Sequence, residues 1–348
     1  MEKRRLGHTD LDVPALCLGT MMYGDQIAES AAVAQMDACV ERGINFFDTA
    51  EMYTVPPKPE TQGESERIIG RWLKARNNRD KIILATKVSG RSPAAYMRDG
   101  PAETRLTHDQ IRFAVERSLK NLQTDYIDLY QIHWPDRDVQ KFGAIRTGYT
   151  HYEDTGEPIE KTLDTLGELV AEGKIRHVGL SNETPYGVMR FLRVSESQKA
   201  PRVVSIQNAY NLLNRVFETG LAEIALEEKV GLLAYSPIAQ GVLTGKYLDG
   251  AAPAGSRKAL YDRLNRYETP AAEEATRGYV ALANDFGVSP AAFAMQFVTT
   301  RPFVTSNIFG ARTTEQLETI FESLAINWTQ EMESAVNELH GRIQNPCP

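Results

Sequence analysis

Four polar residues end or follow apolar runs of the sequence and together suit acid–base chemistry: Asp48, Tyr53, Lys87 and His133. An unperturbed phenol titrates at about pH 10, too high for easy proton transfer at neutral pH. A neighbouring lysine cation favours the phenolate and lowers that pKa, and Asp48 would hold Lys87 in place and charged. With His133 bonded to a substrate oxygen, Tyr53 would protonate that oxygen as a hydride reaches the carbon. The quartet therefore predicts carbonyl reduction.

Each of the four residues also has an ordinary structural role when taken alone. A strand-end aspartate often caps the next helix, a lone histidine is often a core residue, and a lysine after a strand can reach solvent. In a parallel barrel, however, polar residues that end apolar strands point into one shared site. The four residues therefore form one site if the chain folds as such a barrel.

Short β-rich runs alternate with helical patterns along the chain. Most runs are nearly continuous apolar segments, as expected of parallel strands covered on both faces. The eight runs are 14–20, 44–50, 81–88, 126–134, 175–182, 203–208, 230–236 and 304–310. Apolar residues recur at helical spacing between and after them, which predicts helices over 29–42, 64–75, 108–122, 161–172, 185–197, 218–229, 271–286, 289–300, 313–324 and 329–342. This alternation predicts an α/β fold, a single (β/α)8 barrel of the TIM type, with residues 1–348 as one domain.

Three segments are longer than bare connections: 89–107, 135–160 and 240–268. Each follows a predicted strand and so belongs to the carboxyl-end face of the barrel, where barrel active sites form. The segment 135–160 is expected to be a substrate lid or a subunit contact. Residues 1–13 are expected to form a small hairpin across the opposite end. The polar residues that end the remaining strands would join the quartet: Ser181, Asn182, Gln207 and Ser236.

Composition excludes several classes of protein. The 348 residues carry a formal charge of −7, whereas binding to nucleic acid or anionic membranes calls for a basic surface. No apolar run approaches the roughly 18–20 residues of a membrane span, and no signal peptide is evident. Three distant cysteines and no histidine pair with ligand spacing argue against a disulfide framework or a metal site. We expect a cytoplasmic enzyme with a small-molecule substrate; its oligomeric state stays open.

A hydride must come from a cofactor, since no side chain donates one. The Gly-x-Gly-x-x-Gly fingerprint of a Rossmann domain is absent. An alternative anion site follows the last run, where Gly310 and Arg312 precede a helix with the capping pattern Thr313-x-x-Gln316. A helix N-terminus beside an arginine favours phosphate binding; the same pattern is also compatible with a simple helix start.

The motifs that contain these residues resemble the aldo-keto reductases over essentially the whole chain. They are DTAEMY, TK at Lys87, QIHWP, GLSN, QN at 207–208, AYSPIAQGVLTGKY and GARTTEQLE. The segments VPPKPETQGESE, SNETPYGVMR and NLLNR are most similar to the Tas-type, NADP(H)-dependent subgroup. The resemblance implies an eight-stranded barrel that binds NADPH or NADP⁺ without a Rossmann domain. It also implies Tyr53 as the proton donor, tuned by Lys87 and Asp48, with His133 orienting the substrate.

The resemblance further implies which residues bind the cofactor. Ser181, Asn182 and Gln207 would bind the nicotinamide carboxamide, and Tyr235 would stack on its ring. Arg312 would bind the 2′-phosphate, with help from Arg257. The remaining implied cofactor contacts are Thr20, Met21, Asp48, Ser236, Pro237, Ile238, Gln240, Lys246, Gly310 and Gln316.

Two departures from the family pattern concern affinity and specificity. Many relatives have Glu-Asn where this chain has Thr319 and Ile320, so a polar adenine contact is missing. Many relatives also have a tryptophan after the Gly-Thr of the first loop, where this chain has methionines. Methionine is adaptable, which is compatible with broad specificity. The expected substrate pocket comprises Met22, Tyr23, Tyr53, His133 and Trp134; for Trp134, core packing is the alternative.

Two other functions compete with an NADPH-dependent reductase. The first is a redox-sensing regulatory or binding protein, as the potassium-channel β subunits of the same family are. Those relatives lack the histidine of the quartet, so the presence of His133 favours the enzyme. The second is an aldolase that forms a Schiff base through Lys87.

Overall fold

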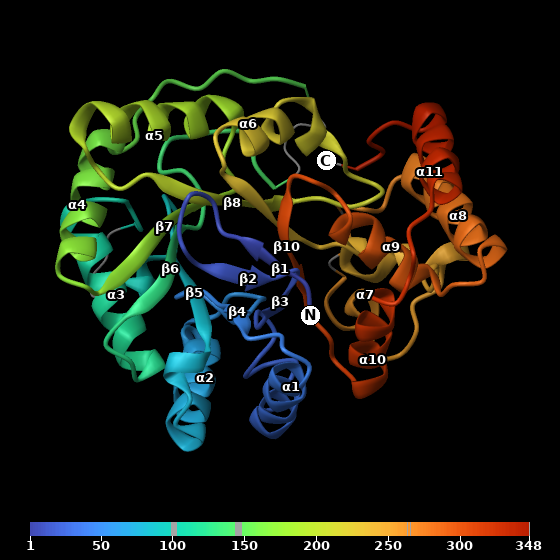
Figure 1. Ribbon diagram of the computed structural model, residues 1–348, viewed down its shortest axis with the longest axis horizontal. Coiled ribbons are helices and arrows are strands. Elements are labelled where there is room, and N and C mark those ends of the chain that lie inside the picture. The colour runs from blue at the N-terminus through green and yellow to red at the C-terminus, as the bar shows by residue number, and fades with distance from the viewer. Residues whose placement is uncertain (99–102, 143–147, 263, 265, 348) are drawn as a thin grey trace.

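A computed structural model of the protein describes residues 1–98, 103–142, 148–262, 264 and 266–347. Its centre is a closed barrel in the order β10-β3-β4-β5-β6-β7-β8-β9 (Figure 1), and every neighbouring pair is parallel. The strands are β3 (Leu16–Gly19), β4 (Phe46–Asp48), β5 (Ile83–Val88), β6 (Ile127–Ile132), β7 (Ile175–Ser181), β8 (Val203–Ala209), β9 (Gly231–Tyr235) and β10 (Val304–Phe309). Each strand lies within one of the predicted runs or extends one residue beyond it. The predicted (β/α)8 barrel is confirmed.

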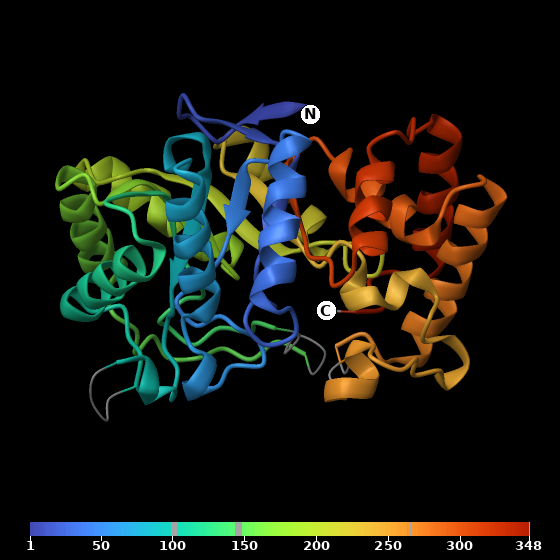
Figure 2. The same ribbon diagram turned by 90° about the horizontal axis from the view of Figure 1, so that it is seen from below.

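Helices surround the barrel and cover the outer faces of its strands, except Pro270–Asp285 and Gln330–Arg342, which lie farther out. The helices are α1 (Glu29–Glu41), α2 (Glu64–Arg76), α3 (His108–Leu122), α4 (Ile159–Ala171), α5 (Pro185–Gln198), α6 (Leu221–Glu227), α8 (Pro270–Asp285), α9 (Pro290–Thr299), α10 (Thr314–Ser323) and α11 (Gln330–Arg342). Most begin at a threonine or serine cap, such as Thr107 for α3. The predicted helix 218–229 is shorter in the structure, because Gly220 separates α6 from a preceding 3-10 turn, Val216–Thr219. Figure 2 shows α8 and α11 side by side, outside the ring of barrel helices.

The predicted loops 89–107 and 240–268 contain short helical turns. The segment after β5 includes Ala95–Met97 in a 3-10 turn, and the segment after β9 includes the turns Ala239–Thr244 and Leu248–Gly250 and the short helix α7 (Arg257–Tyr261). Residues 99–102, 143–147, 263 and 265 of the expected loops lie outside the described part of the chain.

The core has two shells. The outer shell lies between strands and helices, and the inner shell fills the barrel with side chains that include Cys17, Phe46 and Leu129. The predicted hairpin of β1 (Lys3–Arg5) and β2 (Asp12–Pro14) closes the end where the strands begin, and its Leu6 and Val13 join the inner shell. Figure 2 shows this hairpin, in dark blue, at one end of the barrel.

The hairpin turn requires a glycine. Gly7 has a φ of 58°, and a Cβ there would lie 2.6 Å from the Val204 carbonyl oxygen. Because the hairpin closes this end of the barrel, we expect the active site at the other end, where the strands have their carboxyl ends.

Candidate active site

The interior of the barrel changes from apolar to polar toward the carboxyl ends of its strands, where Asp48 ends β4 and is almost wholly buried. The Oδ2 atom of Asp48 accepts a hydrogen bond from Lys87 Nζ at 2.6 Å. The Oδ1 atom accepts from the side-chain amides of Gln131 at 3.0 Å and Gln207 at 2.8 Å. Three other strands, β5, β6 and β8, therefore each supply one donor to this carboxylate.

Lys87 links this carboxylate to Tyr53. Its Nζ also donates to the Thr49 carbonyl oxygen at 2.8 Å and to the Tyr53 hydroxyl oxygen at 3.2 Å. The side chain is fully buried, and an ammonium has three hydrogens, so each hydrogen has one acceptor. The position of the cation beside the phenol is thereby fixed.

His133 lies on the other side of Tyr53, just after β6. The two rings meet edge to face, with centroids 5.6 Å apart. His133 is 8% exposed, and its Nδ1 atom is buried without a hydrogen-bond partner. An unpaired buried polar atom is uncommon and costs free energy. The imidazole therefore keeps unused hydrogen-bonding capacity beside Tyr53.

Burial sets the protonation states of this group. Burial, followed by repulsion from Lys87, lowers the pKa of His133 well below 6.5, so the imidazole is neutral at neutral pH. Burial also disfavours a charged Lys87, but the attraction of Asp48 and Tyr53 outweighs it and raises the pKa of the lysine. The cation beside Tyr53 is therefore retained.

We expected Lys87 to lower the pKa of Tyr53 below its ordinary value of 10. This expectation is wrong, because the pKa is raised overall. Burial disfavours the phenolate more than the lysine favours it, so the pKa of Tyr53 lies above 10. The lysine acts in the expected direction, but its effect is smaller than that of burial. Tyr53 is therefore a protonated hydrogen-bond donor at neutral pH.

Asn182, which follows β7, connects several strand ends beside the quartet. Its Nδ2 atom donates to the His133 carbonyl oxygen at 2.8 Å, and its Oδ1 atom accepts from the Tyr235 hydroxyl at 2.7 Å. Ser181 donates to the Gln207 carbonyl oxygen at 2.8 Å. The structure thus brings the residues expected around a nicotinamide together, although the side chains of Asn182 and Gln207 bind other protein groups.

The backbone after β9 adopts conformations that are uncommon outside glycine. Ser236, Ala239 and Gln240 have φ values of 58°, 49° and 58°. Left-handed turns of this kind can aim successive N–H groups into one concavity that binds anions. A Cβ on Gly241 would lie 3.1 Å from Lys246 Nζ, so the cation lies directly against this segment. Pro237 and Ile238 lie within it. The arrangement suits a pyrophosphate.

The predicted phosphate site after β10 has a capped helix and a guanidinium. Thr313 accepts from the Gln316 backbone N–H at 3.3 Å, and the Gln316 side chain accepts from the Arg312 backbone N–H at 2.8 Å. Arg312 also donates to the carbonyl oxygen of Gly255, two residues before Arg257, and its Nε atom is buried without a partner. Gly310 precedes this group as the first residue after β10. A helix N-terminus beside an incompletely bonded arginine fits a phosphate group.

The first loop, which follows β3, is largely buried. Thr20 donates to the Asp48 backbone carbonyl at 2.9 Å and is fully buried. Met21 is half-buried and Met22 is 8% exposed. Tyr23 is not brought to the quartet: it is 1% exposed, belongs to the outer core and donates its hydroxyl to Gln35 of α1. Its role in the structure is packing.

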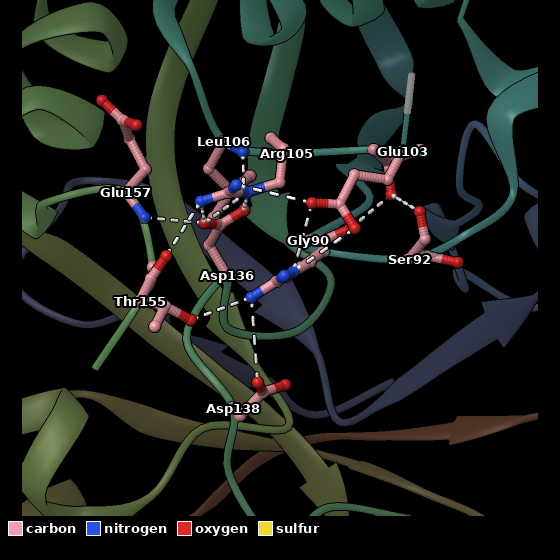
Figure 3. Close-up of polar contacts among 12 residues, drawn as sticks. Gly90, Ser92, Glu103, Arg105, Leu106, Asp136, Asp138, Thr155 and Glu157 are labelled. Atoms are coloured by element: carbon pink, nitrogen blue, oxygen red, sulfur yellow. Dashed lines mark hydrogen bonds and ion pairs between the residues drawn. The ribbon is translucent and has the colours of Figure 1, made fainter. Parts of the chain in front are cut away.

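Two loops hold the segment after His133 in place (Figure 3). Asp136 is nearly buried and accepts hydrogen bonds from the Arg105 side chain, from Leu106 N at 2.9 Å and from Glu157 N at 2.7 Å. These contacts join the segment after β6 to the end of the segment after β5. Trp134 donates to the Arg91 carbonyl oxygen at 3.0 Å. The His133–Trp134 backbone is therefore anchored from both loops.

Sequence reasoning missed three residues that support the site. Gln131 is buried, two residues before His133, and its position on β6 made it recognisable as an inward polar residue. Glu51 and Arg98 form a buried ion pair of 2.8 Å. Glu51 also accepts from Ser89 N at 2.7 Å, and it lies two residues before Tyr53. Nothing in the sequence pairs a loop arginine with this glutamate, because the contact depends on how the loop folds.

Among the described residues, no group of three or more histidine, cysteine or acidic side chains could hold a metal ion, and no helix is long and apolar enough to cross a membrane. The cysteines Cys17, Cys39 and Cys347 are buried and not disulfide-bonded. Burial raises the pKa of Cys39 to about 12. The buried cysteines therefore act as small core residues, as predicted for Cys17 and Cys39.

A parallel barrel with this group of residues at its mouth defines an oxidoreductase site, and the chain belongs to the aldo/keto reductase family. The model of that family matches residues 15–340. Protein tas of Escherichia coli K12 is 45% identical over 348 residues, which is all of both chains. The uncharacterized oxidoreductase YrpG of Bacillus subtilis is 33% identical, covering 97% of this chain and 96% of that protein. L-glyceraldehyde 3-phosphate reductase of Escherichia coli is 31% identical over 93% and 88% of the two chains.

Proposed function

We propose that this protein is an NADPH-dependent reductase that converts aldehydes or ketones to alcohols, with residues 1–348 acting as one domain. The observation that carries the proposal is Lys87 Nζ, which bridges the Asp48 carboxylate at 2.6 Å and the Tyr53 hydroxyl at 3.2 Å. A buried lysine placed this way supports a phenol that must briefly become a phenolate.

The carbonyl oxygen of the substrate would lie between the Tyr53 hydroxyl and the His133 ring. A neutral imidazole orients that oxygen without competing as an acid, and Tyr53 then donates its proton to it. Lys87 stabilises the resulting phenolate, and Asp48 keeps Lys87 charged and in place. Bound NADPH would supply the hydride to the carbonyl carbon.

The residues present fit a phosphorylated dinucleotide. The buried and unpaired Nε of Arg312, the N-terminus of α10 and Lys246 beside the left-handed turns after β9 are three separate anion-binding features. Arg312 would bind the 2′-phosphate and so favour NADPH over NADH. Carbonyl reduction is also consistent with one relative, L-glyceraldehyde 3-phosphate reductase of Escherichia coli, whose name describes the reduction of a phosphorylated aldehyde.

NADPH oxidation with a panel of aldehydes, ketones and quinones tests this proposal. Turnover of at least one carbonyl class supports it. The two competing functions predict different results. A purely regulatory protein would bind NADPH without turnover of any substrate, and an aldolase would give a Lys87 adduct that borohydride traps.

A further inference from the structure

A closed series of contacts outlines the rim above Tyr53 and His133. His133 packs on Trp134 at 4.7 Å between ring centroids, and Trp134 meets Phe142 edge to face at 6.0 Å. The Arg266 guanidinium lies 5.9 Å from the centre of the Phe142 ring. The phenol of Tyr235 is also a neighbour that stabilises the Arg266 charge. The Tyr235 hydroxyl donates to Asn182, which in turn donates to the His133 carbonyl oxygen. Arg266, from the segment after α7, therefore lies on this rim beside Phe142 and Tyr235.

Arg266 differs from most partly buried arginines of this protein. The others generally face a carboxylate at 2.6–2.9 Å, as Arg79, Arg98, Arg105, Arg137, Arg215 and Arg301 do. Within the described residues, no ion pair joins Arg266 to a carboxylate. Its polar neighbours are the phenols of Tyr235 and Tyr267, and burial opposes its charge although these phenols raise its pKa.

Arg117 and Arg312 are also half-buried, and no ion pair joins either of them to a carboxylate among the described residues. Arg117 bonds to Gln62 and to the Met97 carbonyl oxygen, so neutral acceptors hold it at the flank of the barrel. Arg312 is the expected ligand of a cofactor phosphate. A half-buried guanidinium without a counter-charge is costly unless an anion completes it. The neighbours of Arg266 are Phe142, Tyr235 and Tyr267, whereas Arg312 lies in the segment after β10.

We propose that Arg266 recognises an anionic group on the substrate, so that this protein prefers carbonyl compounds that carry a carboxylate or a phosphate. The planar guanidinium suits either group, because both accept two parallel hydrogen bonds. Trp134 and Phe142 would form the apolar wall between the reacting carbonyl and this anion. The inference rests on the proposed reductase function, which it refines by naming the substrate class.

The test compares three para-substituted benzaldehydes: 4-carboxybenzaldehyde, its methyl ester and 4-formylphenyl phosphate. We expect the native protein to favour the charged aldehydes over the ester in kcat/KM by about tenfold or more. Arg266→Met should lower kcat/KM for the charged aldehydes about 10- to 100-fold more than for the ester. Arg266→Lys should restore part of the preference. A larger loss for one charged aldehyde identifies carboxylate or phosphate as the preferred anion.

Arg190→Met is the matched control, because Arg190 pairs with Glu160 on the outer helices, and it should keep the native preference. The proposal is overturned if Arg266→Met lowers kcat/KM equally for all three aldehydes, or if it changes only the Kd of NADPH. If the native protein reduces no aldehyde, the proposed function fails separately. In that case, binding to the NADPH-loaded protein tests the anion site. The site requires that 4-(hydroxymethyl)benzoate binds more tightly than benzyl alcohol, and that Arg266→Met abolishes this difference in Kd.

Discussion

The two ends of the barrel each bury an aspartate, but the groups around them differ. At the end closed by the hairpin, Asp128 near the start of β6 binds Arg79 at 2.7 Å, Arg176 at 2.9 Å and the Leu84 backbone N–H at 3.0 Å. At the mouth, Asp48 binds Lys87, whose remaining contacts lead to the Tyr53 hydroxyl.

The difference is in where each network ends. At Asp128, charges are paired and the Tyr126 ring is covered by Arg79 and Arg176, 3.8 and 4.0 Å from its centre. At Asp48, the network ends at a phenol beside an imidazole with an unpaired nitrogen. A buried charge network alone therefore does not mark an active site; a network that ends in groups with unused bonding capacity does.

The largest effect is expected for Lys87→Met at the mouth. It removes the cation that stabilises the phenolate and leaves the buried Asp48 charge without its counter-ion. We expect kcat to fall by about 10³-fold or more, and the free energy of unfolding to fall by roughly 3–5 kcal/mol. Steady-state kinetics and urea unfolding measure the two effects. Activity within tenfold of native would contradict the role of this network in chemistry.

Asp128→Asn is the matched change at the closed end. We expect a loss of roughly 2–3 kcal/mol in the free energy of unfolding, because Arg79 loses its buried carboxylate; the half-exposed Arg176 contributes little. The kcat of the folded protein should stay within about twofold of native, since the hydrogen bonds of Asp128 to described residues, Arg79, Arg176 and Leu84, lie at the closed end. A large fall in kcat without loss of stability would remove the distinction between the two ends.

Arg312→Ala tests the cofactor end of the mouth. We expect the Kd of NADPH to rise about 10- to 100-fold while the Kd of NADH changes much less, because only NADPH has the 2′-phosphate. Fluorescence titration of both cofactors measures this difference. Equal weakening of the two would refute the assignment of Arg312 to that phosphate.

A change of pH is expected to have the smallest effect on catalysis. The pKa of His133 lies well below 6.5 and that of Tyr53 lies above 10. Neither group titrates between these values, so kcat/KM for reduction should be level between pH 6.5 and 10 and fall above it, as Tyr53 loses the proton it must donate. A bell-shaped profile centred near neutral pH, lost in His133→Asn, would show that the imidazole does titrate there.

The stability of the protein should depend on His133 in acid. Its folded pKa is lower than its unfolded pKa, so the unfolded state binds more protons as pH falls below 6.5. This contribution to stability is therefore complete above pH 6.5 and decreases below it. His133→Asn should flatten that part of the curve of unfolding free energy against pH.

The sequence predicted the barrel because eight apolar runs alternate with helical patterns. Most of these runs end in a polar residue, and parallel topology brings those ends together. Asp48, Tyr53, Lys87 and His133 meet for this reason. Tyr23 was misplaced because its position after a strand does not reveal which way a loop side chain turns. The ion pair of Glu51 and Arg98 depends on loop folding, which local pattern does not encode.

The direction in which the pKa of Tyr53 shifts could also not be predicted from the sequence. Residue types identify Lys87 as a neighbour that favours the phenolate, but the opposing effect is the depth of burial, which needs coordinates. The rim residue Arg266 was missed for a similar reason. It lies in a long loop, and only its contacts with Phe142 and Tyr235 place it over the site.

Tyr53→Phe in a single turnover tests the central claim most directly, because it removes one hydroxyl and leaves the ring and the cofactor residues unchanged. The preformed complex with NADPH is mixed with an aldehyde, and NADPH absorbance reports reduction. We expect the rate to fall about 10²- to 10⁴-fold, with the Kd of NADPH unchanged. A native rate in this variant would contradict Tyr53 as the proton donor.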